Sequence, residues 1–435
     1  MQCKTNVISS IPPPRENPRD RTLTFCLAIL SIPLLLLLAL RLRAALMLYL
    51  ENGRDWQIFF SDHRWRWAEC RYLLGGVDPM DAVRGLASAP VPAMQLPEIA
   101  GAFPWAYLLG VLFTFAFLPY PAARALSILL FGCAAAGLLG CGYRFVFAKT
   151  RSRALAAFGV LYLLTSHALY DSLVYGNYGL LCGLLLIAAV FTAPTRPVLA
   201  GICLLFASMK PQLAALFYLA LLIDRNWKPV LIGGLGTLCA WGAAGALCHT
   251  SPLTMLYETF AQSTGNFYDS YSFGIFTHSL PRTAGMFLSM AVCALCMALA
   301  CWWLRRRRES LPHWQLFYYS LPAVFSVCWT YCNIPDHTVL YLLDALVLLC
   351  CWDLIRQKGM RLSLLLLVLA ALCWMLHPDI VTCFLCQMWD YCVPGQLLDP
   401  LFQDLLSWAP PLLWWLFCYL CAAPGRAAER FRALL

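Results

Sequence analysis

The chain has 435 residues, of which 61% are hydrophobic and only 12% carry a charge, and its mean hydropathy is +0.69. This composition excludes an ordinary soluble globular protein and is typical of a polytopic membrane protein. The formal net charge of +9 is modest, and its densest block, Arg305 to Arg308, follows an apolar run. The positive-inside rule accounts for that block better than nucleic-acid binding does, and a polybasic lipid-binding patch is the alternative.

Residues 1–22 are polar, proline-rich and basic, which predicts a cytoplasmic tail before an uncleaved first membrane-spanning run. The apolar runs after it predict an all-α protein with about twelve transmembrane helices in one domain, residues 23–423, followed by a basic cytoplasmic tail at 424–435. The runs lie at 23–48, 103–119, 122–147, 154–171, 177–193, 198–223, 229–248, 284–304, 314–332, 338–355, 361–377 and 404–422.

Four basic clusters of the second half fall on one side of such a topology: Arg225 with Lys228, Arg305 to Arg308, Arg356 to Arg361, and Arg426 to Arg432. The loops 49–102, 249–283 and 378–403 are therefore expected to face outward. In the first half, simple alternation places Lys149, Arg151 and Arg153 outside, against the rule. We therefore expect that some segment between 103 and 223 does not span fully.

The stretch from Asp55 to Asp81 is the first long break between apolar runs. Its apolar residues recur at three- and four-residue steps from Trp56 to Leu74, which predicts an amphipathic helix that lies on the membrane surface and begins at Asp55. Asp55 can act as a general base at the interface, or it can simply cap the helix. Asp62 is one turn from Arg66, and this spacing favours a solvated ion pair.

Local signals interrupt the chain at three further places. Gly75-Gly76 predicts a helix stop, and Asp78 and Asp81 follow in a turn. Residues 175–179 form a polar hinge between apolar runs, and Lys210-Pro211 predicts two half-helices that meet within one run. A lysine at that depth can hold an anionic group, or it can extend its ammonium to the interface.

Two outward segments carry the remaining candidates. The loop at 333–337 places Asp336 and His337 at the start of an apolar run, where the imidazole can donate to a phosphate oxygen or cap a helix. Residues 262–282, with Asn266 and Tyr271, have a composition suited to binding sugars but also to an ordinary interfacial loop. Cys383, Cys386 and Cys392 can form a disulfide in a third outer loop, although their number is odd.

The chain contains no aspartate-any-aspartate triplet for a metal on a nucleotide sugar, no glycine-rich phosphate loop with its lysine, and no histidine-glutamate metal motif. We therefore expect no metal and no other cofactor. Transport driven by nucleotide hydrolysis within this chain is also disfavoured.

Three stretches resemble glycosyltransferase family 87, the polyprenol-phosphate-mannose-dependent α-mannosyltransferases with the C-type membrane glycosyltransferase fold. Residues 53–82 with 103–126 are similar to the family's Asp-led outer loop, Gly-Asp-Pro turn and next helix. Residues 174–229 are similar to its hinge and Lys-Pro centre, and residues 333–349 to its late Asp-His segment. Met80, Asn177 and Thr338 depart from the residues that the family prefers.

The resemblance implies a metal-independent, inverting hexosyltransferase of the bacterial plasma membrane with an outward-facing site. Its expected partners are a polyprenyl-phosphate sugar donor, a glycolipid or glycan acceptor, and membrane lipid, but no nucleic acid. It would make Asp55 the base, His337 a contact to the donor phosphate and Lys210 a supporting cation, with Asn177, Asp336, Asn266 and Tyr271 as further substrate contacts. A lipid-linked-sugar flippase or secondary transporter is the alternative, because it also needs many helices and a charge within the membrane.

Overall fold

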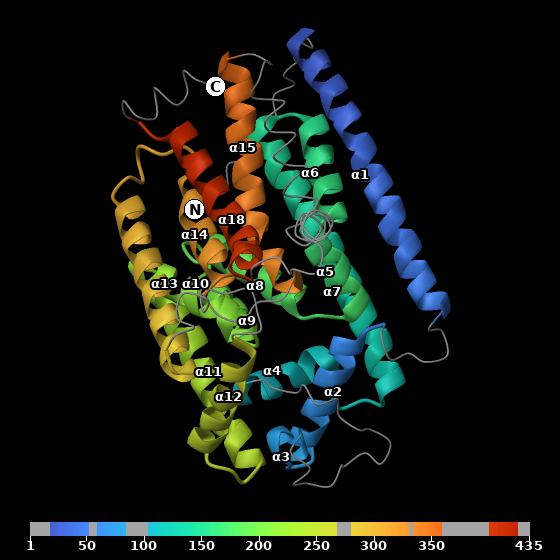
Figure 1. Ribbon diagram of the computed structural model, residues 1–435, viewed down its shortest axis with the longest axis vertical. Coiled ribbons are helices and arrows are strands. Elements are labelled where there is room, and N and C mark those ends of the chain that lie inside the picture. Colours follow the sequence, from blue (N-terminus) through green and yellow to red (C-terminus); the bar gives the residue numbers. More distant parts are fainter. Residues whose placement is uncertain are drawn as a thin grey trace, which may run out of the picture.

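The computed structural model describes residues 18–51, 59–83, 103–267, 280–329, 334–358 and 400–424, and every regular element in them is a helix (Figure 1). The helices are α1 (Pro18–Glu51), α2 (Ser61–Leu74), α3 (Pro79–Val83), α4 (Pro104–Thr114), α5 (Tyr120–Thr150), α6 (Arg153–Thr165), α7 (His167–Tyr175), α8 (Gly179–Thr192), α9 (Pro197–Ala207), α10 (Pro211–Ile223), α11 (Trp227–Leu247), α12 (Pro252–Phe267), α13 (Arg282–Arg305), α14 (Trp314–Ser326), the 3₁₀ helix η2 (Ile334–Leu340), α15 (Tyr341–Lys358) and α18 (Pro400–Ala422).

Five helical segments among the described residues are long and apolar enough to cross a membrane, in α1, α5, α11, α13 and the continuous η2–α15. A sixth is obtained if α6 and α7, which meet at an angle of 49°, are taken as one broken segment. The prediction of an all-α membrane protein is confirmed, but the predicted twelve membrane-spanning helices are not. The runs at 103–119, 177–193 and 198–223 contain only shorter helices, and the run at 361–377 lies outside the described residues.

The short helix α4 accounts for the basic residues that did not fit simple alternation. It has only 11 residues and ends where Phe115 takes a left-handed conformation. Figure 1 shows α4 lying crosswise near the lower end, with α5 rising from there, so that the α5–α6 turn lies at the same end as the start of α1. Lys149, Arg151 and Arg153 therefore lie at the same end of the bundle as the start of α1, which agrees with the positive-inside rule if that end is cytoplasmic. The short α4 is one of the segments between 103 and 223 that are too short to span fully.

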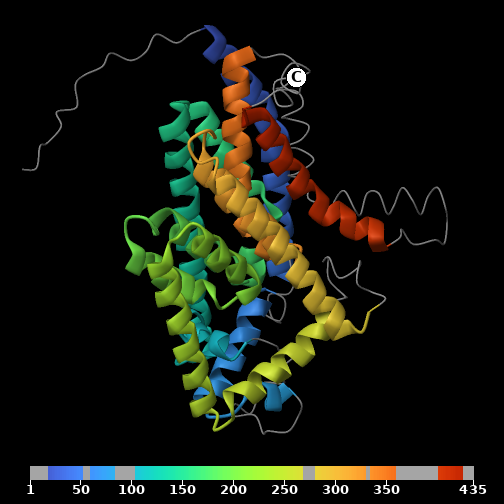
Figure 2. The ribbon, with the colours of Figure 1, turned by 90° about the vertical axis from the view of Figure 1, so that its left-hand side faces the viewer.

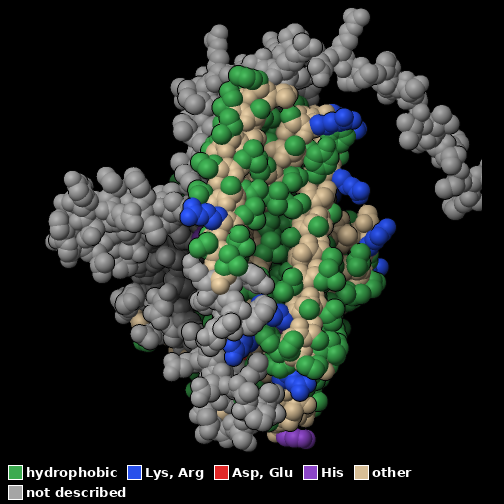
Figure 3. All heavy atoms as spheres, turned by 90° about the vertical axis from the view of Figure 1, so that its right-hand side faces the viewer, with side chains coloured by type: hydrophobic (Ala, Val, Ile, Leu, Met, Phe, Trp, Pro, Cys, Tyr) green, Lys and Arg blue, Asp and Glu red, His purple; other side chains and the backbone are tan. Residues whose placement is uncertain are grey.

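The outer face of α1 carries the side chains expected of a lipid-facing helix. Phe25, Ile32 and Leu36 are each more than half exposed, and Figure 3 shows hydrophobic side chains over most of the described surface on this side. The inner face of α1 packs on α6. There the buried Arg41 donates a hydrogen bond to the carbonyl of Thr165, at the break between α6 and α7. A helix end leaves its last carbonyls unpaired, so Arg41 stabilises the break.

The helix α2 differs from the surface helix that its sequence predicted. It begins at Ser61, with Phe60 in the N-cap position, and it packs against α4, α3 and α5. Residues from more than one of its faces are buried, including Trp67, Glu69 and Tyr72. The apolar periodicity correctly predicted a helix, but the apolar face of that helix packs against protein rather than lipid. Asp55 lies outside the described residues.

The turn after α2 agrees with its sequence. Gly75 ends the helix, and Gly76 takes a positive φ of 75°. The carboxylate of Asp78 then accepts a hydrogen bond from the backbone N–H of Met80 at 2.9 Å. This contact is the turn predicted for Asp78, and it leads directly into α3.

Candidate functional site

The site is built around the hinge between α7 and α8. The hinge turns at Gly176, whose φ is +67° and whose missing Cβ would lie 2.9 Å from side-chain atoms of His63 and Phe60. Only glycine combines this backbone conformation with so close an approach to α2. The next residue, Asn177, is thereby held next to the first turn of α2.

The second element is the break between α9 and α10. Helix α9 ends at Ala207, and Pro211 is the first residue of α10, where a proline has no N–H to leave unpaired. Lys210 occupies the N-cap position between them, so its side chain leaves the helical path at the break. The half-helices predicted from Lys210-Pro211 are confirmed.

The third element, η2, contacts α8 through its backbone. A Cβ on Gly179 would lie 2.3 Å from the carbonyl oxygen of Pro335, and a Cβ on Gly183 would lie 2.5 Å from Oγ1 of Thr338. That hydroxyl donates to the Gly179 carbonyl at 2.7 Å. Two glycines one turn apart therefore form the surface on which η2 rests, and they fix where Asp336 points.

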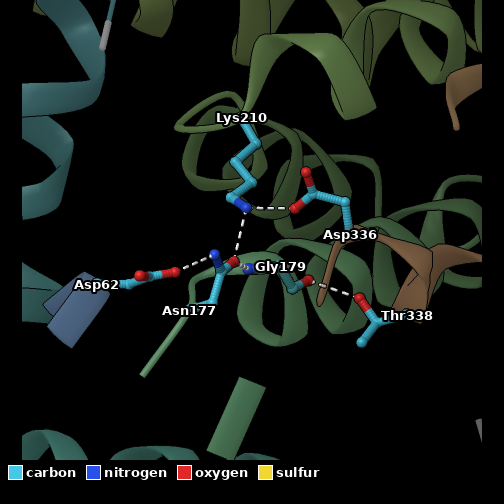
Figure 4. A network of polar contacts seen from close by, with 6 residues as sticks. All are labelled: Asp62, Asn177, Gly179, Lys210, Asp336 and Thr338. Carbon is cyan, nitrogen blue, oxygen red and sulfur yellow. Dashed lines mark hydrogen bonds and ion pairs between the residues drawn. The ribbon is translucent and has the colours of Figure 1, made fainter. Parts of the chain in front are cut away.

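These three elements and α2 are joined by one polar network (Figure 4). The ammonium of Lys210 donates to the carboxylate of Asp336 and, at 2.6 Å, to Oδ1 of Asn177. The same amide oxygen accepts the N–H of Gly179 at 2.8 Å. Because Oδ1 receives both donors, Nδ2 of Asn177 must face the other way, and it donates to Asp62 at 2.5 Å. Four segments that are distant in sequence thus meet at Asn177.

The two carboxylates of the network have different environments. Asp336 is 1% exposed and is paired with the Lys210 ammonium, whose side chain is 14% exposed. Asp62 is half-buried, and its one hydrogen bond to a described residue comes from the neutral amide of Asn177. Burial raises the pKa of Asp62 above its usual value, although the Asn177 hydrogen bond and the charge of Lys210 act in the opposite direction. Asp62 therefore takes up a proton more readily than an ordinary aspartate does.

The sequence assigned a different role to Asp62. The expected partner, Arg66, instead pairs with Glu69 through Nη1 and Oε2 at 2.6 Å, and Asp62 accepts from Asn177, 115 positions further along the chain. The interpretation of Asp62 as one half of a solvated ion pair with Arg66 was therefore wrong. Spacing along one helix cannot reveal a partner contributed by another segment.

A buried imidazole lies one residue further along α2. His63 is fully buried beside the rings of Phe60 and Tyr120, at centroid distances of 5.2 and 6.0 Å. Burial lowers the pKa of His63 to about 4, and the positive charge of Arg124 acts in the same direction. The nearby Thr114 carbonyl opposes the shift, but no hydrogen bond of normal geometry forms to a described residue. His63 is therefore neutral at pH 7, and it leaves the Lys210 ammonium as the positive charge of the network.

The structure brings together three of the predicted site residues, Asn177, Lys210 and Asp336. His337 follows Asp336 in η2 and is half-buried. Asn266 belongs to α12, but its side chain is not among those described. The remaining predicted positions, Asp55, Tyr271, Cys383, Cys386 and Cys392, lie outside the described residues.

The glycine contacts generate a stability prediction. Replacing Gly183 by Ala forces its Cβ into Thr338, and replacing Gly179 by Ala forces it into the Pro335 carbonyl. Overpacking of this kind costs about 1–3 kcal/mol. We expect each variant to unfold at a lower temperature than the unmodified protein in the same detergent. The unfolding temperature is measured from the change in tryptophan fluorescence as buried indole rings become exposed.

The matched control is Gly132→Ala in α5, where an added Cβ meets nothing within 4 Å. Alanine is favoured over glycine within a helix by up to about 1 kcal/mol. This variant should therefore unfold at the same temperature as the unmodified protein or slightly above it. Equal behaviour of the control and the two α8 variants would contradict the close packing of η2 on α8.

Comparison with known proteins adds one result to this geometry. The model of glycosyltransferase family 87 matches residues 104–330, just over half of the 435-residue chain. The match contains the α7–α8 hinge and the α9–α10 break, and it ends before η2. No curated protein and no solved structure matches the chain. The matched segment includes Asn177 and Lys210, two residues at the centre of the network, and on this evidence the chain belongs to glycosyltransferase family 87.

Proposed function

We propose that the protein transfers a hexose, mannose, from a polyprenyl-phosphate sugar to an envelope glycolipid or glycan acceptor at the outer face of the bacterial plasma membrane. Family membership supports the transferase activity, and the apolar helices support a membrane location. The observation that carries the proposal is the network in which Lys210 and Asp62 lie on opposite sides of one amide, Asn177. It provides a cation for a phosphate and a carboxylate for a hydroxyl within one site.

We assign the general base to Asp62. Asp336 is a poor candidate because it is almost fully buried and its carboxylate is already engaged by the Lys210 ammonium. Asp62 is more exposed and has a raised pKa, which makes it a stronger base than an ordinary carboxylate. The sequence resemblance had assigned this role to Asp55, which remains the second candidate.

Lys210 is proposed to bind the donor phosphate. An ammonium has three N–H donors, and in Lys210 two of them are used by Asn177 and Asp336. The third remains available for a phosphate oxygen. His337 lies next to Asp336 on η2 and is proposed as a second donor to the same phosphate. Asn266 and Tyr271 are retained as proposed sugar contacts.

The proposed reaction is a single displacement at the anomeric carbon. The acceptor hydroxyl gives its proton to the Asp62 carboxylate while its oxygen bonds to the anomeric carbon. The bond from that carbon to the phosphate oxygen breaks, and the electron pair leaves with the polyprenyl phosphate. Lys210 stabilises the charge that develops on the leaving phosphate. Attack from the face opposite the phosphate inverts the configuration.

A lipid-linked-sugar flippase is the second candidate function, and one observation favours it. The described part of the chain contains two interrupted helical segments, at Ser166 between α6 and α7 and at Lys210 between α9 and α10. Interrupted helices that present their ends to a substrate are common in transporters. The two functions differ in whether a covalent bond to the sugar is broken.

Transfer can be measured with purified protein, radiolabelled polyprenol-phosphate mannose and a membrane lipid extract. We expect the label to move from the donor to an extracted lipid or glycan. Movement of intact donor across a vesicle membrane with no labelled product would support the flippase instead. Absence of both donor binding and product would contradict both functions.

Paired substitutions test the assignment of the base. Asp62→Asn should lower kcat by about 10²–10⁴-fold, because removal of a general base costs this much. Asp81→Asn, outside the network, is the control and should keep its activity. In the unmodified protein, kcat/KM should fall on the acid side at a higher pH than an ordinary carboxylate would give, since the pKa of Asp62 is raised. Full activity of Asp62→Asn together with loss in Asp55→Asn would transfer the role to Asp55.

Lys210 has both a structural and a proposed catalytic role, and a double substitution separates them. Lys210→Met leaves Asp336 buried without its cation, which costs about 3–5 kcal/mol of stability. Adding Asp336→Asn removes the buried charge, so the double variant should regain thermal stability but not transferase activity. Recovery of both stability and activity would show that Lys210 serves only to neutralise Asp336.

A further inference from the structure

One face of α13 is an uninterrupted apolar stripe. Its residues are spaced alternately by four and three positions, and each is 48 to 60% exposed: Leu288, Val292, Leu295, Leu299 and Trp302. Figure 2 shows α13 running obliquely along the outside of the bundle on this side. The stripe belongs to one of the candidate membrane-spanning helices, so it faces lipid.

Four arginines end this helix, and they alternate in direction. Arg305 places Nε 3.9 Å from a carboxylate oxygen of Asp224, and Arg307 donates from Nη1 to the hydroxyl of Tyr419 at 2.9 Å. Arg306 and Arg308 are exposed instead, and neither has a hydrogen bond or ion pair to any residue that the structure describes. Arg307 also lies over the ring of Trp303, at 4.3 Å from its centroid, and the charge of Arg308 acts on Asp224. Arg306 and Arg308 thus differ from the other two arginines in being exposed and in making no hydrogen bond to a described residue.

Each exposed guanidinium rests on an indole. The central carbon of Arg306 is 3.6 Å from the ring centroid of Trp302, and that of Arg308 is 4.8 Å from the ring centroid of Trp314. Stacking orients the planar guanidinium, while the N–H groups at its edge remain free to donate. Such an edge matches two oxygens of a phosphate.

The position of these residues along α13 fits the headgroup region of a membrane. At 1.5 Å per residue, the 18 steps from Leu288 to Arg306 span about 27 Å, close to the thickness of a hydrocarbon core. The stripe ends in Trp302, and tryptophan is enriched at the level of the headgroups. Arg306 then follows one turn later, where a lipid phosphate would lie.

The charges around the two arginines favour an anionic lipid. Asp224 is already held by Arg305, Asn226 and the hydroxyl of Tyr319, and Asp353 is paired with His313 at 3.0 Å. Glu309 is the remaining acidic neighbour in sequence, and it is exposed. Basic residues at a membrane surface attract anionic lipids with about 1 kcal/mol each.

We propose that Arg306 and Arg308, supported by Trp302 and Trp314, bind the phosphate of an acidic phospholipid in the leaflet where α13 ends. Positive-inside topology requires only positive charge at this end of the helix. It does not require that the two exposed arginines be held on indole rings beside an apolar stripe. The lipid would thus anchor α13 at a fixed depth.

The experiment compares lipid binding to purified protein by native mass spectrometry, with phosphatidylglycerol and phosphatidylcholine as probes. The unmodified protein should bind phosphatidylglycerol about 10- to 30-fold more tightly than phosphatidylcholine. Arg306→Gln with Arg308→Gln should lose most of this preference. Arg306→Lys with Arg308→Lys keeps the charge but not the stacked, two-oxygen geometry, and it should retain only part of the preference.

The matched control replaces Arg144 and Arg196 by Gln, two exposed arginines that carry the same charge but lie elsewhere, in α5 and directly before α9. It should keep the preference of the unmodified protein. The proposal is overturned if the Arg306 and Arg308 glutamine variant keeps its preference, or if the control loses as much. Full retention in the lysine variant would attribute binding to charge alone, and displacement of the lipid by millimolar inorganic phosphate would identify a free anion as the ligand.

Discussion

The ion pair between Lys210 and Asp336 is the interaction on which the arrangement of the site depends. Both side chains are largely removed from water, so either one alone would be a costly buried charge. Together they tie the α9–α10 break to η2, and Asn177 extends the connection to the α7–α8 hinge and to α2. A break in a helix leaves backbone N–H and C=O groups without helical partners, and side chains at the break can point into the interior of the bundle. Here the break is used to bring a cation to a position that a continuous helix would not provide.

The sequence predicted the points at which the backbone is interrupted, because the cause of each interruption is local. Proline removes an N–H, so Lys210-Pro211 divides its apolar run in two. Gly76 and Gly176 take positive φ values, and both end a helix where the sequence indicated a stop or a hinge. The break at Ser166 has a local signal as well, since the Ser166 hydroxyl caps α7, but a serine within an apolar run was too weak to be recognised.

Long-range contacts account for what the sequence did not predict. The sequence predicted that Asp62 pairs with Arg66, because helical spacing considers only residues of the same segment. Its actual partner, Asn177, comes from another segment of the fold. Likewise, the periodicity of α2 revealed a helix with an apolar face but not whether lipid or protein covers it. The predicted twelve membrane-spanning helices are not confirmed in the described part of the chain, for a related reason. Hydropathy measures how apolar a run is, and short helices buried within a bundle are as apolar as those that cross a bilayer.

The contact between η2 and α8 has a consequence for how this site can change. Gly179 and Gly183 meet η2 through its main-chain carbonyl and one hydroxyl, so the position of Asp336 depends little on the shapes of neighbouring side chains. The other residues around the site are consequently free to vary in size and polarity without moving the ion pair. Selectivity for a sugar or an acceptor can then change while the backbone around the ion pair stays the same. Gly179 and Gly183 themselves are the positions that tolerate substitution least.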